Sequence, residues 1–315
     1  MIGTYPDFHE IELADQPLLD PLFRRLREGV SELTFAGLFC FRATHAYRLS
    51  RLPDGTIVLA GSDKGDSRGE RRALLDADHR GRVWEPSQGS HQKCFFVCPF
   101  ALPPRDLLDA LFERCTCLKL ATEAQAGWLR GAGYEVSEDR DNFDYLYHRE
   151  DLASLAGRAL QKKRNLVHAF ERAHLQETLP LTRERIGDAL AVLEAWREHA
   201  RDLADYVPAR DALVHGVEFG LEGRITYVAD EPAGYALGEP AANGTMFIVH
   251  YEKTVPDTKG LYQFINMDFA RALPAQFSLI NREQDLGDPG LRQAKMTYRP
   301  CAFVKKYRAR KPGPA

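Results

Sequence analysis

The side chains best suited to chemistry gather near the end of the chain, where two apolar runs of strand length each end in polar and charged residues. The first run, residues 246–253, ends in His250, Glu252 and Lys253. The second, residues 277–285, ends in Asn281, Arg282, Glu283 and Asp285. Carboxylates, a guanidinium and an ammonium can together hold an anion and move a proton. Because α/β folds bind ligands beyond the carboxyl ends of their strands, we expect these groups to converge on one solvent-reachable cleft.

Side chains alternate along a strand, so each run has two faces. In the second run, one face is predicted to carry Phe277, Leu279, Asn281 and Glu283, and the other Ile280, Arg282 and Gln284. Both faces begin apolar and turn polar at the same point, which is typical of a buried strand that emerges into a cleft. By the same rule, His250 is expected to share a face with Ile248 and Glu252. A core histidine with satisfied hydrogen bonds is the alternative to a functional His250.

A helix is predicted to follow the second run. Asp288 is a good N-cap and Pro289 suits the first helical position. Helical spacing then places Lys295 and Tyr298 on the face that carries Leu291. An ammonium and a phenol beside this strand end could bind an anion and donate a proton. A salt-bridged corner between strand and helix is the alternative, because structural ion pairs use the same residues.

Residues 151–175 predict one amphipathic helix in the middle of the chain. Lys163 falls near the centre of its apolar stripe, so its charge must reach solvent, find a partner or line a cavity. The neighbouring Lys162 and Arg164 lie away from the stripe and could meet the phosphates of a donor. A cationic face that is simply solvated is the alternative.

Composition excludes several classes of protein. The chain has 315 residues, 44% of them hydrophobic and 28% charged, and a net charge of −3. These values are typical of a globular protein and argue against a general nucleic-acid coat. No apolar run approaches the roughly 18–20 residues of a membrane span, and the N-terminus lacks the pattern of a signal peptide. We therefore expect a cytoplasmic protein.

The six cysteines do not predict a metal site. The spacings Cys94-x3-Cys98 and Cys115-x-Cys117 both differ from the usual zinc knuckle. Free cysteines behave as small buried hydrophobic residues. We predict reduced, buried thiols and no bound metal.

The order of predicted elements divides the chain into two similar halves. In the first, strands are expected at residues 38–42, 47–52, 56–60, 94–100 and 144–148, and helices at 15–28, 103–119 and 123–131. Residues 61–92 are polar and predict a mobile loop with a short helix at 68–77. In the second, strands are expected at 225–228, 234–237, 246–252, 277–284 and 302–307, and helices at 261–272 and from 289. We predict an α/β protein with mixed sheets in two domains, residues 1–150 and 151–315.

Several segments resemble a known family. They are residues 35–42 (FAGLFCFR), 160–165 (LQKKRN), 250–253 (HYEK), 281–287 (NREQDLG), 290–300 (GLRQAKMTYRP) and 305–307 (KKY). Together they resemble the phosphatidylglycerol lysyltransferase C-terminal domain family over nearly the whole chain, and 281–287 is the most specific part. The resemblance implies two tandem GNAT-like acyltransferase domains. Characterised relatives move an aminoacyl group from a charged tRNA onto a lipid headgroup. The membrane-bound ones carry a spanning domain that this sequence does not show, so a stand-alone member is expected.

The resemblance leaves the acyl donor open, and residues 256–260 bear on it. A GNAT domain that uses acyl-CoA normally cradles the pyrophosphate in a glycine-rich turn that enters a helix. Here the matching place is 256–260, which offers Lys259 and Gly260 but departs from the usual glycine pattern. This departure favours aminoacyl-tRNA, or another activated acyl donor, over acyl-CoA as co-substrate, and none of them would be a permanently bound cofactor.

The residues and the resemblance together predict a metal-free acyltransferase of aminoacyl type, with an amine or hydroxyl acceptor such as a lipid headgroup. Glu283 or Glu252 would act as base or amine anchor, and Tyr298 as proton donor. Substrate binding is assigned to Asn281, Arg282, Asp285, Lys295, His250 and Lys253, and donor binding to Lys163, Lys162, Arg164, Lys259 and Gly260. Two alternatives use the same fold: a catalytically inactive protein that senses a ligand, and an acetyl-CoA-dependent N-acetyltransferase.

Overall fold

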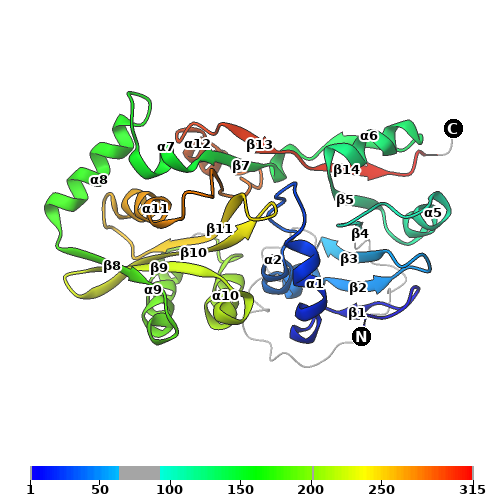
Figure 1. Cartoon of the computed structure of the whole chain (residues 1–315), viewed down its shortest axis with the longest axis horizontal. Coiled ribbons are helices and arrows are strands. Elements are labelled where there is room, and N and C mark those ends of the chain that lie inside the picture. The colour runs from blue at the N-terminus through cyan, green and yellow to red at the C-terminus, as the bar shows by residue number, and fades with distance from the viewer. Residues whose placement is uncertain (1, 64–92, 201, 314–315) are drawn as a thin grey trace. The chain divides into compact units, whose positions relative to one another are not determined.

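The computed structural model describes residues 2–63, 93–200 and 202–313, and the helix expected at 68–77 lies outside them. The chain forms two compact units (Figure 1). The first comprises Met1–Asp15, Phe41–Ser137 and Tyr307–Ala315, and the second Gln16–Cys40 and Glu138–Lys306. The units interleave along the chain, in contrast to a single boundary at residue 150. Each contains one mixed sheet, which confirms the predicted class.

The sheet of the first unit has the strand order β1-β2-β3-β4-β5-β14-β6. Its strands are β1 His9–Glu10, β2 Arg48–Arg51, β3 Ile57–Asp63, β4 Lys93–Val97, β5 Cys117–Ala121, β6 Glu135–Glu138 and β14 Tyr307–Arg310. Its helices are η1 Leu13–Asp15, α3 Arg42–His45, α5 Arg105–Arg114 and α6 Glu123–Gly131. Leu108, Leu111 and Leu129 of the last two pack with Phe96 and Leu118 of the sheet to form the core.

Three expectations for this part of the sequence are wrong. The helix expected at 103–119 ends at Arg114, and β5 then pairs in parallel with β4. Residues 38–42 are not a strand, because Phe35–Cys40 forms the buried helix α2 of the second unit. A short apolar run does not distinguish a buried helix from a strand. Cys94 and Cys115 form a disulfide, whereas Cys40, Cys98 and Cys117 are buried and Cys301 is exposed.

The sheet of the second unit has the order β13-β7-β12-β11-β10-β9-β8. Its strands are β7 Asp144–His148, β8 Gln176–Pro180, β9 Glu222–Val228, β10 Glu231–Ala241, β11 Met246–Thr254, β12 Leu279–Asn281 and β13 Ala302–Val304. Its helices are α1 Gln16–Phe23, α2, η2 Arg140–Asn142, α7 Arg149–Ser154, α8 Gln161–Ala173, η3 Arg183–Arg185, α9 Ile186–His199, α10 Tyr206–Phe219, α11 Leu261–Ala272 and α12 Pro289–Met296.

Helices cover both faces of this second sheet. Figure 1 shows α7, α8, α11 and α12 on one side and α9 and α10 on the other. Ala236, Phe247 and Ile280 of the sheet pack with Phe264 and Phe269 of α11, so we call this side the α11 face. Lys253 contacts Trp196 of α9 on the opposite side, which we call the α9 face.

Two further elements differ from expectation. The helix expected at 151–175 is split, because Leu155 and Gly157 adopt positive φ angles of 47° and 78° between α7 and α8. The guanidinium of Arg164 donates to the carbonyl oxygens of both residues and so holds the break. The last strand, expected at 302–307, is two strands that belong to different sheets, β13 and β14.

Candidate functional site

The parallel strands β11 and β12 separate at the stretch that carries the candidate residues. They pair only from Met246 opposite Leu279 to Ile248 opposite Asn281. Beyond this point the β12 chain stays bonded to β7, because Arg282 N donates to Tyr145 O at 3.0 Å and Tyr145 N donates to Glu283 O at 3.1 Å. β11 instead continues along β10 to Thr254. The polar residues therefore flank a split between two strands.

A β-bulge at His250 decides which face each side chain of β11 occupies. Tyr251 lies opposite Leu237, but Val249 lies opposite Gly238, so His250 is the extra residue. A bulge of one residue reverses the alternation beyond it. His250 therefore contacts Glu239 on the α9 face, while Glu252 reaches α11 on the other. The prediction that His250 and Glu252 share a face is wrong.

On the α11 face, Arg282 and Glu252 form an ion pair across the split. Arg282 Nη2 lies 2.5 Å from Glu252 Oε2, and each side chain is less than a tenth exposed. Asn266 Nδ2 donates to Glu252 Oε1 at 2.8 Å, and the Tyr262 hydroxyl lies 3.3 Å from Oε2. Burial opposes the charge of Arg282, but Glu252 outweighs it and raises the arginine pKa above its ordinary value.

Tyr298, which follows α12, joins this cluster. The guanidinium carbon of Arg282 lies 4.9 Å from the centre of its ring, and Lys163 Nζ of α8 lies 4.4 Å from it. Burial raises the pKa of Tyr298 to about 12, although Arg282 acts in the opposite direction. Its hydroxyl therefore keeps its proton at neutral pH.

Three atoms of this cluster are buried without a hydrogen-bond partner: Arg282 Nε, Tyr298 Oη and Asn266 Oδ1. They make up three of the five such atoms in the described part of the chain. A buried polar group that is left unpaired costs about 1–3 kcal/mol and is rare in folded proteins. Their concentration in one place indicates a site where a ligand supplies the missing partners.

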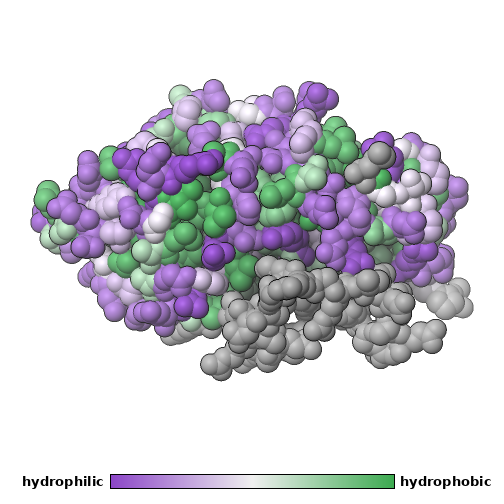
Figure 2. Space-filling view, turned by 90° about the horizontal axis from the view of Figure 1, so that it is seen from below, coloured by the Kyte–Doolittle hydropathy of each residue, from purple (hydrophilic) through white to green (hydrophobic). Residues whose placement is uncertain are grey.

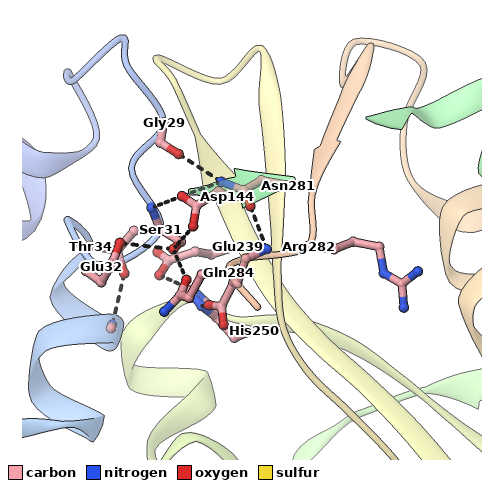
Figure 3. A network of polar contacts seen from close by, with 12 residues as sticks. Gly29, Ser31, Glu32, Thr34, Asp144, Glu239, His250, Asn281, Arg282 and Gln284 are labelled. Atoms are coloured by element: carbon pink, nitrogen blue, oxygen red, sulfur yellow. Dashed lines mark hydrogen bonds and ion pairs between the residues drawn. The ribbon is translucent and has the colours of Figure 1, made fainter. Parts of the chain in front are cut away.

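On the α9 face, His250 lies between the carboxylates of Glu283 and Glu239, and Figure 3 labels His250 and Glu239. Nδ1 is 2.7 Å from Glu283 Oε1, and Nε2 is 3.0 Å from Glu239 Oε1. Burial opposes a charged imidazole, but the two carboxylates raise the pKa of His250 to about 10. Glu283 is a quarter exposed, and its Oε2 has no hydrogen-bond partner among the described residues.

A second buried network adjoins His250 on this face. Asn281 Nδ2 donates to Gly29 O at 2.9 Å and to Asp144 Oδ2 at 3.1 Å. Lys306 Nζ lies 2.6 Å from Asp144 Oδ1 and also contacts Glu32. Burial raises the pKa of Glu32 to about 6, against the opposite effect of Lys306. These bonds anchor the segment before α2 to β7 and β12, which is a structural role.

The candidate residues therefore form two groups and do not converge on one cleft. In Figure 3, Arg282 points away from the other labelled side chains. The α11 face carries Arg282, Glu252, Tyr298 and Lys163, and the α9 face carries His250, Glu283, Asn281 and Lys253. The split between β11 and β12 lies between the two groups.

Asp285 and Lys295 hold the turn after β12. Asp285 accepts from Arg292 Nε and Nη2, both at 2.8 Å, and from the Tyr145 hydroxyl at 2.5 Å. Burial disfavours its charge, but these bonds keep the Asp285 pKa well below its usual range.

Lys295 Nζ donates to the carbonyl oxygens of Arg282 and Gln284 at 2.5 and 2.6 Å. These bonds bracket Glu283, whose φ angle is +56°. Burial lowers the pKa of Lys295 to about 8, with Glu283 acting in the opposite direction. Asp285 and Lys295 thus shape the site by holding the backbone around Glu283.

The remaining predicted residues lie apart from both groups or have structural partners. Lys162 and Lys259 are exposed, and Arg164 closes the break between α7 and α8. Lys253 Nζ is 3.2 Å from Asp205 Oδ2 and 3.8 Å from the centre of the Trp196 ring. Lys163 is also predicted to bind the donor, and its ammonium does reach the cluster on the α11 face.

Gly260 begins α11 and packs against α8. Its φ angle is +89°, and a Cβ at this position would overlap the carbonyl oxygen of Leu166 and lie 3.0 Å from Phe170 Cβ. The glycine is therefore required by the helix contact. In place of a ligand phosphate, the backbone of α8 lies against the residue where a GNAT pyrophosphate turn is expected.

We expect Gly260→Ala to lower the free energy of unfolding by about 3 kcal/mol or more, because strain at positive φ adds to displacement of α8. Gly244→Ala is the matched control. Gly244 has a φ angle of +79° and open space around its Cβ position, so it should lose about 1 kcal/mol. Urea unfolding of both variants measures the difference. An equal decrease in the free energy of unfolding of both variants would show that the contact with α8 adds no cost at position 260.

Sequence reasoning missed several residues of both groups. They are Glu239, Asn266, Tyr262, Asp144, Glu32 and Lys306. Asn266 and Tyr262 are one turn apart on a helix that is otherwise apolar on this side, and this spacing is a usable signal. The others come from distant segments, and only the folded chain brings them together.

The face seen in Figure 2 is largely hydrophilic, with hydrophobic residues gathered in separate patches. Within residues 2–63, 93–200 and 202–313, no helix has the length and apolar character needed to cross a membrane. The same residues contain no group of three or more His, Cys, Asp or Glu side chains arranged to hold a metal ion.

Comparison with known proteins links this geometry to a family and a fold. The pattern of the family described as phosphatidylglycerol lysyltransferase, C-terminal, matches residues 87–310. A conserved protein of unknown function from Bacteroides thetaiotaomicron superposes with a TM-score of 0.79 at 26% identity, over 99% of this chain and 100% of the other.

Two other solved structures share the fold at lower identity. L-PGS from Bacillus licheniformis superposes with a TM-score of 0.60 at 14% identity, over 100% of this chain and 95% of the other. FemX superposes with a TM-score of 0.55 at 11% identity, over 96% of each chain. The architecture is that of tandem GNAT-like acyltransferases.

Proposed function

The chain belongs to the phosphatidylglycerol lysyltransferase C-terminal family, and on this premise we propose that it transfers an aminoacyl group from aminoacyl-tRNA to an amine or hydroxyl acceptor. The family and the fold support an acyltransferase of the GNAT-like type related to aminoacyl transfer. Our proposal adds the identity of the two substrates: a tRNA donor, and an acceptor such as a lipid headgroup.

The unpaired atoms on the α11 face carry this proposal. Arg282 Nε and the Tyr298 hydroxyl are donors that need an acceptor, whereas Asn266 Oδ1 is an acceptor that needs a donor. The orientation of the Asn266 amide is fixed because its Nδ2 donates to a carboxylate. An aminoacyl ester offers both kinds of partner, a carbonyl oxygen and an α-ammonium. An acetyl group has no donor for Asn266.

In this arrangement the donor ester lies on the α11 face and the acceptor approaches from the α9 face. Arg282 Nε and the Tyr298 hydroxyl hydrogen-bond the carbonyl oxygen, and Glu252 with Asn266 anchors the α-ammonium. The nucleophile bonds to the carbonyl carbon and gives its proton to Glu283 Oε2. The ester C–O bond then breaks, and Tyr298 protonates the departing 3′-oxygen. Glu283, which is a quarter exposed, releases its proton to solvent, and the Tyr298 phenolate takes up a proton after the products leave, so both groups return to their starting state. These are general acid–base steps with electrostatic stabilisation of the developing oxyanion.

Blocking the amine of the donor tests the proposal. We expect the full chain to transfer the acyl group of an aminoacyl-tRNA, and kcat/KM to fall by about 5- to 150-fold with the N-acetylaminoacyl-tRNA, because Asn266 Oδ1 then loses its donor. Release of labelled amino acid from tRNA into acceptor is the measurement. Equal rates with both donors would remove Asn266 from recognition. Binding without turnover would favour the sensor.

The contact between α8 and Gly260 argues against acyl-CoA as the donor. Leu166 and Phe170 lie against the start of α11, where a pyrophosphate would need free backbone N–H groups. Acetyl-CoA at millimolar concentration should therefore give no turnover and no rise in melting temperature, measured by differential scanning fluorimetry beside the tRNA assay.

A further inference from the structure

Lys163 is a cation without a counter-ion in the cluster on the α11 face. It comes from α8 and lies 4.4 Å above the Tyr298 ring. It makes no hydrogen bond or ion pair with any residue that the structure describes. Burial lowers its pKa below the ordinary lysine value, and the positive charge of Arg282 lowers it further. The fold therefore places this ammonium where its own charge is disfavoured.

The charges of the cluster do not balance. Arg282 is paired with Glu252, and the ion pair is buried. Lys163 then adds one positive charge, and no carboxylate of the described residues pairs with it. A half-buried unpaired ammonium costs free energy, and an anion that binds beside it recovers that cost.

The surrounding groups are mostly hydrogen-bond donors. Tyr298 is 4% exposed, and its hydroxyl has no hydrogen-bond partner in residues 2–63, 93–200 and 202–313. Arg282 Nε–H also lacks an acceptor within this described part of the chain. With Arg282 Nε and the Tyr298 hydroxyl bonded to the ester oxygen, the three N–H donors of Lys163 beside the same ring suit a separate oxyanion next to the acyl position.

From these observations we propose that Lys163 forms an anion subsite beside the acyl position and binds a phosphate group of a substrate. The inference rests on the proposed function for the identity of that substrate. Two sources of phosphate are compatible with aminoacyl transfer. One is the phosphodiester next to the 3′-terminal nucleoside of the donor, and the other is the phosphate of a glycerophosphate headgroup in the acceptor.

Binding of small phosphates to the full chain tests the subsite without any transfer reaction. The probes are inorganic phosphate, adenosine 5′-monophosphate and glycerol 3-phosphate, titrated by isothermal calorimetry at low ionic strength. We expect millimolar or tighter binding to the unmodified chain. Lys163→Gln should weaken it by about 10- to 100-fold, the value of a charge-assisted hydrogen bond. Lys163→Arg should retain most of the affinity because it keeps the charge.

Arg172→Gln is the matched control, since Arg172 is an exposed cation in the last turn of the same helix. It should bind phosphate as the unmodified chain does. Tighter binding of the nucleotide identifies the donor as the source of phosphate, and tighter binding of glycerol 3-phosphate identifies the acceptor. Equal affinity for all three probes means that the subsite recognises the phosphate group alone.

Two results would overturn the inference: no phosphate binding to the unmodified chain, or equal weakening in Lys163→Gln and Arg172→Gln. Neither depends on turnover, so failure of the subsite and failure of the transferase proposal can be told apart. A purely structural Lys163 would change the melting temperature of Lys163→Gln and leave its phosphate affinity intact.

Discussion

Replacing Tyr298 with phenylalanine is expected to lower kcat for aminoacyl transfer by about 10²- to 10⁴-fold, the usual contribution of a positioned proton donor. The hydroxyl has no hydrogen-bond partner among the described residues, so its removal leaves none of them unsatisfied. The ring keeps its contacts with Arg282 and Lys163. The melting temperature should therefore change little. Single-turnover kinetics with aminoacyl-tRNA measures the rate of the chemical step.

Tyr235→Phe provides the matched control for this prediction. Tyr235 is also fully buried with an unpaired hydroxyl, but it lies opposite Lys253 on β10, on the α9 face. The chemical change is identical, and the rate should stay within about twofold of the unmodified chain, since no transition-state contact is lost. If Tyr298→Phe retains full kcat, or if both variants lose it equally, Tyr298 is not the proton donor.

Removing a carboxylate beside His250 is expected to cause a large loss of stability. Glu239→Gln removes one of the two charges that hold the imidazolium, and Glu239 is 2% exposed. His250 has a pKa of about 10 instead of 6.5. One pKa unit corresponds to about 1.4 kcal/mol, so loss of one carboxylate should cost roughly 2–3 kcal/mol of unfolding free energy near pH 6.

The pH dependence of this loss follows from the direction of the shift. A pKa that is raised in the folded state stabilises the fold fully below the unfolded value of 6.5. The contribution disappears as pH rises through about 10. Urea unfolding between pH 6 and 10 should therefore show a difference between the unmodified chain and Glu239→Gln that narrows as pH rises. A difference that is constant across this range would mean that His250 is neutral in the folded protein.

A second histidine–glutamate pair serves as the control. His215 Nδ1 lies 2.8 Å from Glu218 Oε2, but the Glu218 side chain is 54% exposed. An exposed ion pair contributes about 0–1 kcal/mol. Glu218→Gln should therefore change stability little at any pH in the same experiment. The contrast isolates burial as the cause of the effect at Glu239.

The candidate site was predictable where local rules act alone. Alternation along residues 279–283 correctly separates Asn281 and Glu283 from Arg282. Asp288 caps its helix as expected, because its Oδ1 accepts from Leu291 N at 2.6 Å. In each case, neighbours within one strand or one turn determine the outcome.

Other expectations failed because a single backbone feature changed the pattern. The bulge at His250 sends Glu252 to the opposite face, and the positive φ of Glu283 brings Gln284 within 3.2 Å of Ser31 on the α9 face, away from Arg282. Phe277 precedes β12 and packs with Phe247 on the α11 face. These irregularities depend on partner strands and on Lys295, and no local pattern encodes them.

The sequence by itself determined the types of side chain at the site, the strands and helix that carry them, and the family. Hydrophobic period and capping residues act over a few positions, so they can be read directly. Only the tertiary structure decided that two groups lie on opposite faces of one sheet, that Asn266 completes one of them, and that Lys163 has no counter-ion among the residues described. These outcomes depend on burial and on contacts between residues up to 275 positions apart, as between Ser31 and Lys306.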